Sequence, residues 1–227
     1  MEAETISKNA QRSTSHNRRL CLVMLVAALI ASGAMAQRTY TDLAGNKVRY
    51  GIQAGLNFSN YWGSDAPDVT MKPGIQLGAI MEYKDAKFRN FSSQTGLLFS
   101  QKGGNEEGDK LTMNYLLLPI IVQYNLVRGN SMGFFVKAEY YFGYAISGKY
   151  KYNYDGSWES EKIDFADEGL QRFDMGLGLG AGLQIMDMMQ IGIGYNWSFY
   201  PLVKNPGYWV NFYNSNLALN VTFFFGK

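Results

Sequence analysis

The stretch from Phe173 to Ile185 constrains the fold more than any other part of the chain, because apolar residues alternate with small or polar ones through all 13 positions. An extended strand separates such residues onto opposite faces, whereas a helix would scatter them. A tilted strand needs roughly 9–11 residues to cross a membrane. The stretch therefore predicts a membrane-spanning β-strand, with an apolar face formed by Phe173, Met175, Leu177, Leu179, Ala181, Leu183 and Ile185.

An alternative interpretation is a dinucleotide-binding turn, since Gly176, Gly178 and Ala181 fit the pattern G-x-G-x-x-G/A. Such a site needs a strand, a tight turn and then a helix N-terminus that holds the pyrophosphate. Here the glycines lie within the alternation and no helical periodicity follows them. The pattern favours the strand.

The same alternation recurs in seven more segments, which are 48–59, 74–83, 91–101, 116–124, 134–144, 189–199 and 216–225. The connections alternate between tight ones (84–87, 127–131 and 186–188) and long ones (60–70, 102–111, 147–171 and 201–214). This places all long loops at one end, as in barrels with periplasmic turns and extracellular loops. The sequence predicts an all-β fold, an eight-stranded antiparallel up-and-down transmembrane β-barrel over 47–227.

A soluble lipocalin-like barrel would also have eight alternating strands, but with its apolar face inside. Eight strands enclose an interior only just wide enough for side chains. The apolar face here is bulky, and the opposite face is rich in Gly, Asn, Gln and Ser, which suits a crowded interior. We therefore expect the apolar face to contact lipid, with ring closure pairing every backbone donor and acceptor.

The N-terminal 36 residues have the features of a leader and signal peptide. Arg18 and Arg19 precede an apolar run from Leu20 to Ile30, and Ala34–Ala36 forms a small-residue cleavage site. The alternative is a membrane helix, but the run is much shorter than the ~20 residues that a spanning helix needs. We predict cleavage after Ala36, with 37–46 as a short periplasmic segment before the barrel.

Composition excludes several kinds of chemistry from the exported part. The only histidine and the only cysteine are His16 and Cys21, so thiol chemistry, Ser-His nucleophiles and the usual zinc sites are absent after cleavage. The first 36 residues hold four of the 21 basic and two of the 19 acidic residues, which leaves 17 of each. A neutral chain without a basic run argues against nucleic acid as a partner. We predict no enzyme activity, no catalytic residues, no cofactor and no metal site.

Charged residues on the predicted inner face require partners, because an unpaired charge in a dry interior is costly. We predict a paired lumenal polar network that includes Arg49, Glu82, Lys137, Glu139 and Asp174. The glycines of 173–185 and 189–199 leave interior space. We expect lumenal aromatic residues to fill it, namely Tyr115, Phe135, Tyr141 and Phe224, while a small ligand cavity is the alternative.

The longest loop has a distinctive sequence, in which tyrosines alternate with Lys149, Lys151 and Asn153 before Asp155-Gly156. Asp-Gly between alternating segments is a strong hairpin signal. We predict that the fifth strand continues beyond the membrane and returns, presenting a candidate extracellular interaction face of Tyr150, Tyr152, Tyr154 and Trp158. A hairpin that packs only on itself is the alternative.

The sequence resembles the PorT-like family of small outer-membrane β-barrels. The matching pieces are G-I-Q-A-G-L-N-F-S-N at 51–60, L-L-F-S-Q-K-G at 97–103, Y-L-L-L-P-I-I-V-Q-Y at 115–124 and F-D-M-G-L-G-L-G-A-G-L at 173–183. The resemblance implies a non-enzymatic eight-stranded barrel, and some relatives assist protein export across the outer membrane. The chain departs from the pattern at Leu117, where an acidic residue is usual, and at Gly194, where arginine is usual.

Together these features predict a protein of the bacterial outer membrane, in contact with outer-membrane lipid and acting as a structural or interaction protein of the cell envelope. Its partners would be other envelope or secretion proteins. A narrow channel or a small-ligand-binding barrel is the alternative function.

Overall fold

The computed structural model describes residues 39–106, 109–128, 131–154, 157–167, 169–203 and 212–225. The predicted signal peptide and its cleavage after Ala36 lie outside these residues. The described part contains ten strands: β1 (Tyr40–Thr41), β2 (Lys47–Trp62), β3 (Thr70–Lys84), β4 (Phe91–Glu106), β5 (Asp109–Arg128), β6 (Met132–Tyr154), β7 (Ser157–Lys162), β8 (Phe173–Ile185), β9 (Met189–Ser198) and β10 (Tyr213–Phe224). Among the described residues, no helix is long and apolar enough to cross a membrane.

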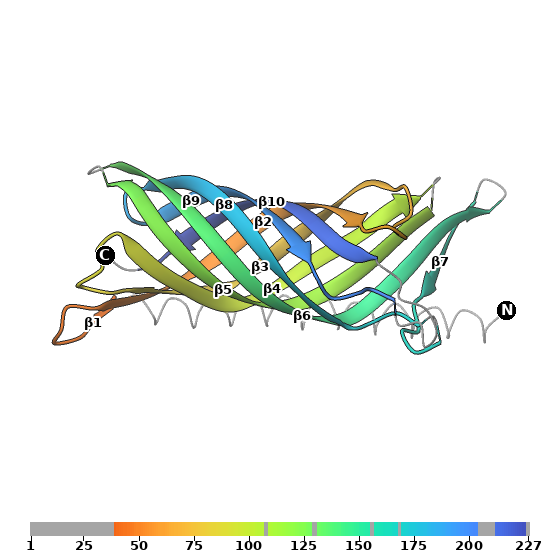
Figure 1. The fold of residues 1–227 in the computed structure, drawn as a ribbon, viewed down its shortest axis with the longest axis horizontal. Helices are drawn as coiled ribbons and strands as arrows, with labels where there is room; N and C mark the ends of the chain where they lie inside the picture. The colour runs from red at the N-terminus through yellow and green to blue at the C-terminus, as the bar shows by residue number, and fades with distance from the viewer. Residues whose placement is uncertain are drawn as a thin grey trace, which may run out of the picture. The chain divides into compact units, whose positions relative to one another are not determined.

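Eight of the strands form a closed ring, in which each pairs antiparallel with its neighbours in the order β2-β3-β4-β5-β6-β8-β9-β10. The ring closes through β10 and β2, with Leu219 opposite Leu56. The strands run obliquely around the barrel (Figure 1). Closure leaves no open edge within the ring of eight strands, which is the condition for β-structure in lipid. All eight predicted segments are therefore confirmed as strands of an up-and-down barrel.

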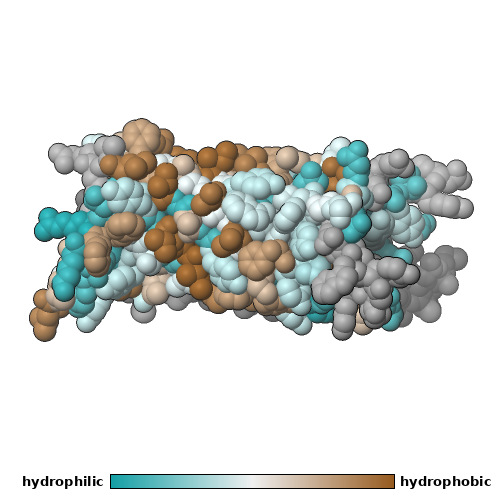
Figure 2. Space-filling model, viewed as in Figure 1, coloured by the Kyte–Doolittle hydropathy of each residue, from teal (hydrophilic) through white to brown (hydrophobic). Residues whose placement is uncertain are grey.

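The apolar face of each strand points outward, as predicted. In β8, Leu177 and Leu179 are 44% and 60% exposed, whereas Asp174, on the opposite face of the same strand, is 1% exposed. Figure 2 shows hydrophobic residues over the flank of the barrel and hydrophilic residues toward its ends. A soluble barrel would have the reverse arrangement, so the lipocalin-like alternative is excluded.

The two ends of the barrel differ. The turn end carries the short connections 85–90, 129–131 and 186–188, and the loop end carries 63–69, 163–172 and 199–212. Met186 and Asp187 have φ of 50° and 56°, and the Met188 N–H donates to the Ile185 carbonyl at 3.1 Å. Two successive residues with positive φ are the signature of a type I′ turn, whose twist suits a hairpin.

The predicted long loop over 102–111 is wrong. Pairing between β4 and β5 continues from Lys102 opposite Met113 up to Glu106 opposite Asp109. Beyond the membrane a strand needs no apolar outer face, so the alternation of apolar residues ends while the strand goes on. The prediction placed the end of each strand where its contact with lipid ends.

The predicted extension of the fifth strand is present. β6 continues to Tyr154, and β7 returns beside it with Ser157 opposite Tyr154. The Asp155-Gly156 turn itself lies outside the described residues.

Near the N-terminus, β1 pairs with the start of β2, so the predicted periplasmic segment 37–46 contains the first strand and the turn of a short hairpin. The Asp42 carboxylate accepts hydrogen bonds from the Ala44 and Asn46 N–H groups, 2.9 Å each, and these bonds lower its pKa.

Candidate functional site

The turn end of the lumen is filled by a polar network centred on Glu82. Its carboxylate forms an ion pair with Arg49 and accepts a hydrogen bond from Gln94 at 3.1 Å, and Lys84 Nζ lies 3.5 Å away. The Arg49 guanidinium also stacks over the Phe224 ring, 4.1 Å from its centroid. Gln94 extends the network to Gln123, Gln190 and, through Gln190, Gln184. These four amides link β4, β5, β8 and β9 across the interior.

Arg49 and Glu82 come together because the register of β2 and β3 places them directly opposite each other. Both side chains are almost fully excluded from solvent. A buried ion pair is favourable only when further hydrogen bonds satisfy the charged groups. Here Gln94 donates one to Glu82, and Arg49 donates one to the Asp187 carbonyl. The arrangement fixes these side chains in the lumen.

A second polar group, the loop-end cluster, surrounds Asp174. Lys102 Nζ lies 2.9 Å from its carboxylate, and Asn214 donates to the same oxygen at 3.4 Å. The ammonium of Lys102 also sits 4.3 Å from the centroid of Tyr141 and 5.3 Å from that of Tyr115, within cation–π range. Sequence reasoning named Asp174 but missed Lys102, because Lys102 was assigned to a loop.

Lys137 and Glu139 form a third, separate pair in the middle of the barrel, 3.9 Å apart. They are neighbours on the inner face of β6, and Asn196 Nδ2 donates to Glu139 at 3.2 Å. The five predicted lumenal residues therefore lie in three groups rather than in one network.

Aromatic side chains occupy the space above the lumenal glycines, as predicted. A Cβ atom added to Gly182 would lie 2.5 Å from the Phe135 ring, and one added to Gly176 would lie 2.7 Å from Tyr141. Gly192 and Gly194 differ, because an added Cβ would make no contact shorter than 3.4 Å. The lumenal space next to the glycines is therefore filled along β8 and less crowded along β9.

Residues from the end of β2 and from the connecting loops cover the loop end of the lumen, and we call Tyr61, Val69, Ile163, Phe165 and Leu202 the loop cap. All five are buried and belong to the same hydrophobic cluster as the lumenal Met113 and Tyr115. Ile163 packs against the inner face of β6 at Gly148. Sequence reasoning missed these residues because loops have no periodicity that marks an inward side chain.

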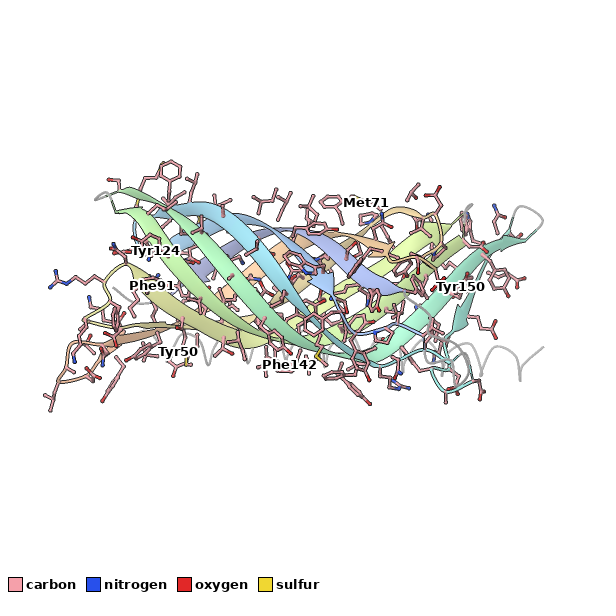
Figure 3. All side chains as sticks on the ribbon, viewed as in Figure 1. Tyr50, Met71, Phe91, Tyr124, Phe142 and Tyr150 are labelled. Atoms are coloured by element: carbon pink, nitrogen blue, oxygen red, sulfur yellow. The ribbon has the colours of Figure 1, made fainter. Side chains whose placement is uncertain are left out.

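The predicted tyrosine face is only partly present. Tyr150 lines a pocket of about 170 Å³ together with Tyr61, Leu111 and Phe212. Tyr152 donates a hydrogen bond to Glu159 at 3.1 Å, and this bond, together with the nearby negative charge, raises the pKa of Tyr152. Figure 3 shows Tyr150 at the opposite end of the barrel from Phe91 and Tyr124. The Tyr154 side chain lies outside the described residues.

Trp158 does not share the face of the tyrosines, so that part of the prediction is wrong. It stands opposite Asn153, whereas Glu159 and Glu161 stand opposite Tyr152 and Tyr150. Trp158 is 52% exposed and stacks with Lys110, whose Nζ is 4.9 Å from the ring centroid. The pairing of Tyr154 with Ser157 fixes this register. The Asp-Gly hairpin signal in the sequence could have revealed it.

Among the residues that the structure describes, no three His, Cys, Asp or Glu side chains form a group that could hold a metal ion.

Residues 32–204 match the family described as Outer membrane protein beta-barrel domain. The chain belongs to this family. Together with the closed ring and its outward apolar face, this membership places the protein in the bacterial outer membrane. In this setting the short turns of such barrels face the periplasm and the longer loops face outward. No curated protein matches the chain.

Several solved outer-membrane proteins are similar in structure. Neisserial surface protein A is 11% identical with a TM-score of 0.44, and the match covers 77% of this chain and 96% of that one. Ail of Yersinia pestis, in complex with the heparin analogue sucrose octasulfate, is 15% identical with a TM-score of 0.41 and coverages of 78% and 99%. OprG from Pseudomonas aeruginosa is 14% identical with a TM-score of 0.41 and coverages of 85% and 99%. We transfer no role from these proteins.

Proposed function

We propose that this outer-membrane barrel is a non-enzymatic structural or interaction protein of the cell envelope. The observation that carries the proposal is the filled lumen: the turn-end network, the loop-end cluster and the loop cap succeed one another along its length. A barrel whose interior holds interlocked side chains offers its loops and turns to other molecules, and not a path for solutes.

The hairpin of β6 and β7 supports an interaction role. On the outer surface, Asn114 donates to Ser147 at 2.9 Å and accepts from Gln101 at 3.1 Å, where the apolar band ends. β6 continues for seven residues beyond Ser147, and β7 is exposed throughout. A paired ribbon that projects from the membrane presents backbone and side chains to a partner. The resemblance to PorT-like barrels implies a role accessory to protein secretion, with a secretion protein as the partner.

A narrow channel or a small-ligand-binding barrel is the second candidate. The open space beside Gly192 and Gly194, together with the partial exposure of Lys137 and Glu139, favours it. Both features lie at the middle of the lumen, between the turn-end network and the loop-end cluster. A channel would require at least one of these groups to move aside.

Two measurements on the protein purified from membranes test the proposal. In a liposome-swelling assay we expect no passage of small sugars above that of empty liposomes, with a general porin as the positive control. In gentle detergent extracts we expect an envelope protein to co-purify with the barrel, and to be lost on deletion of residues 150–161. That deletion should leave barrel insertion intact, as monitored by protection from protease. Rapid sugar passage, or the absence of any co-purifying envelope protein, would refute the interaction role. A partner that binds equally well without residues 150–161 would refute the hairpin as its binding site.

A further inference from the structure

Strand register gathers four lysines on the outward surface of the loop end. Lys110 of β5 stands directly opposite Lys151 of β6, and Lys149 of β6 stands directly opposite Lys162 of β7. We call Lys110, Lys149, Lys151 and Lys162 the lysine face. All four are exposed, and Trp158 lies beside them against Lys110.

The hairpin separates its charges by sign. Glu159 and Glu161 pair with Tyr152 and Tyr150 and so project on the inner face, away from the lysines. None of the four lysines forms an ion pair with another described residue. Glu161 is thus the immediate neighbour of Lys162 along the chain, but the alternation directs its carboxylate to the other side.

Like charges directly opposite each other on neighbouring strands are destabilising. The lysine face contains two such pairs side by side, Lys110 with Lys151 and Lys149 with Lys162. An external anion bound between the two lysines of a pair would attract both of them, and this attraction would replace their mutual repulsion. Phosphate oxygens accept several hydrogen bonds from ammonium groups, so a phosphate is well matched to such a pair.

The height of the lysine face above the membrane indicates where the anion comes from. Below the polar residues Asn114 and Ser147, the outward side chains are apolar and exposed, as at Leu116 and Tyr144. Lys149 follows Ser147 by two residues. At a rise of about 3.3 Å per residue and a tilt of about 40°, it lies roughly 5 Å beyond the apolar band, and Lys151 roughly 10 Å. This is the depth of lipid headgroups.

We propose that the lysine face binds the phosphate groups of anionic lipid headgroups in the outer leaflet. Each lysine near an anionic lipid surface is attracted to it electrostatically, and four lysines on one face add their contributions. Trp158 stands on the same surface, and an indole ring of this kind is favoured where apolar and aqueous regions meet. The binding would anchor the hairpin against the membrane, with its tyrosine side turned toward the barrel axis.

The test compares two variants that remove the same charge. Lys149→Gln/Lys151→Gln takes one lysine from each cross-strand pair, and Lys47→Gln/Lys87→Gln takes two exposed lysines from the turn end. The probe is fluorescent phosphatidic acid, titrated by anisotropy into the protein in neutral detergent, with fluorescent phosphatidylcholine for comparison. Circular dichroism establishes that both variants are folded.

We expect the native protein to prefer phosphatidic acid over phosphatidylcholine. Lys149→Gln/Lys151→Gln should weaken phosphatidic acid binding by roughly thirtyfold, which corresponds to about 2 kcal/mol. The turn-end variant should change it by less than about twofold. Equal losses in both variants, or no preference for phosphatidic acid, would overturn the proposal. Full competition by about 10 mM inorganic phosphate would also overturn it, because the site would then be one for soluble anions.

Discussion

Gly182 and Gly192 face each other across β8 and β9, and they offer a stringent test of how tightly the lumen is packed. A Cβ at Gly182 would lie 2.3 Å from the Ile191 carbonyl oxygen and 2.5 Å from the Phe135 ring. A Cβ at Gly192 would lie 3.5 Å from its nearest neighbours, which is ordinary contact. The two positions share a strand pair and a face, so each serves as the control for the other.

The intrinsic gain from replacing a strand glycine by alanine, about 0.5–1 kcal/mol, applies to both sites and cancels in the comparison. What remains is the overpacking at Gly182, which typically costs about 1–3 kcal/mol. The urea midpoint of unfolding of Gly182→Ala should therefore be roughly 0.5–1.5 M lower than that of Gly192→Ala. This range assumes that the free energy of unfolding falls by about 2 kcal/mol per M of urea. Gly192→Ala should be at least as stable as the native barrel.

The assay is urea unfolding of the barrel in lipid vesicles, followed by tryptophan fluorescence. Adding Phe135→Leu to Gly182→Ala should recover part of the lost stability, because it removes the clash with the Phe135 ring. The clash with the Ile191 backbone carbonyl remains. The remaining deficit measures the backbone contact. Equal midpoints for the two alanine variants would refute the reasoning that the lumen is closely packed against β8.

Two further predictions concern the polar groups. Glu82→Leu leaves Arg49 buried without its partner and should lose about 3–5 kcal/mol in the same assay, while Arg49→Met/Glu82→Leu should recover most of it. A double variant no more stable than the single one would contradict the pairing. Glu159→Gln removes the negative charge that disfavours the tyrosinate at Tyr152. The pKa of Tyr152 should therefore fall toward its ordinary value, as measured by tyrosine-selective NMR with Tyr152→Phe for assignment, and an unchanged pKa would argue against the hydrogen bond.

The membrane-spanning part of the fold was predictable because lipid imposes a strict period of two. Every residue of β8 was assigned to the correct side of the barrel, since a shift of one residue would place all the apolar side chains inside. Outside the lipid this constraint ends. Residues of β4 beyond Gln101 therefore appeared to be a loop, and with them Lys102, the partner of Asp174, was missed.

The loop cap could not have been predicted for a related reason. Ile163, Phe165 and Leu202 are buried by the path of their loops, and no pattern in the sequence distinguishes them from exposed apolar residues. Trp158 is different, because the turn length determines its side. Its placement required only that Tyr154 and Ser157 be taken as the last pair of the hairpin.

The seam between β2 and β10 joins the strands that come first and last in the sequence of the ring. No fragment that stops before Tyr213 contains both sides of this seam, so an incomplete chain would expose two unpaired backbone edges to lipid. Assembly of the closed ring in the membrane must therefore wait for β10. A nonsense mutation that removes only β10 should abolish accumulation of the protein as completely as one that removes every strand.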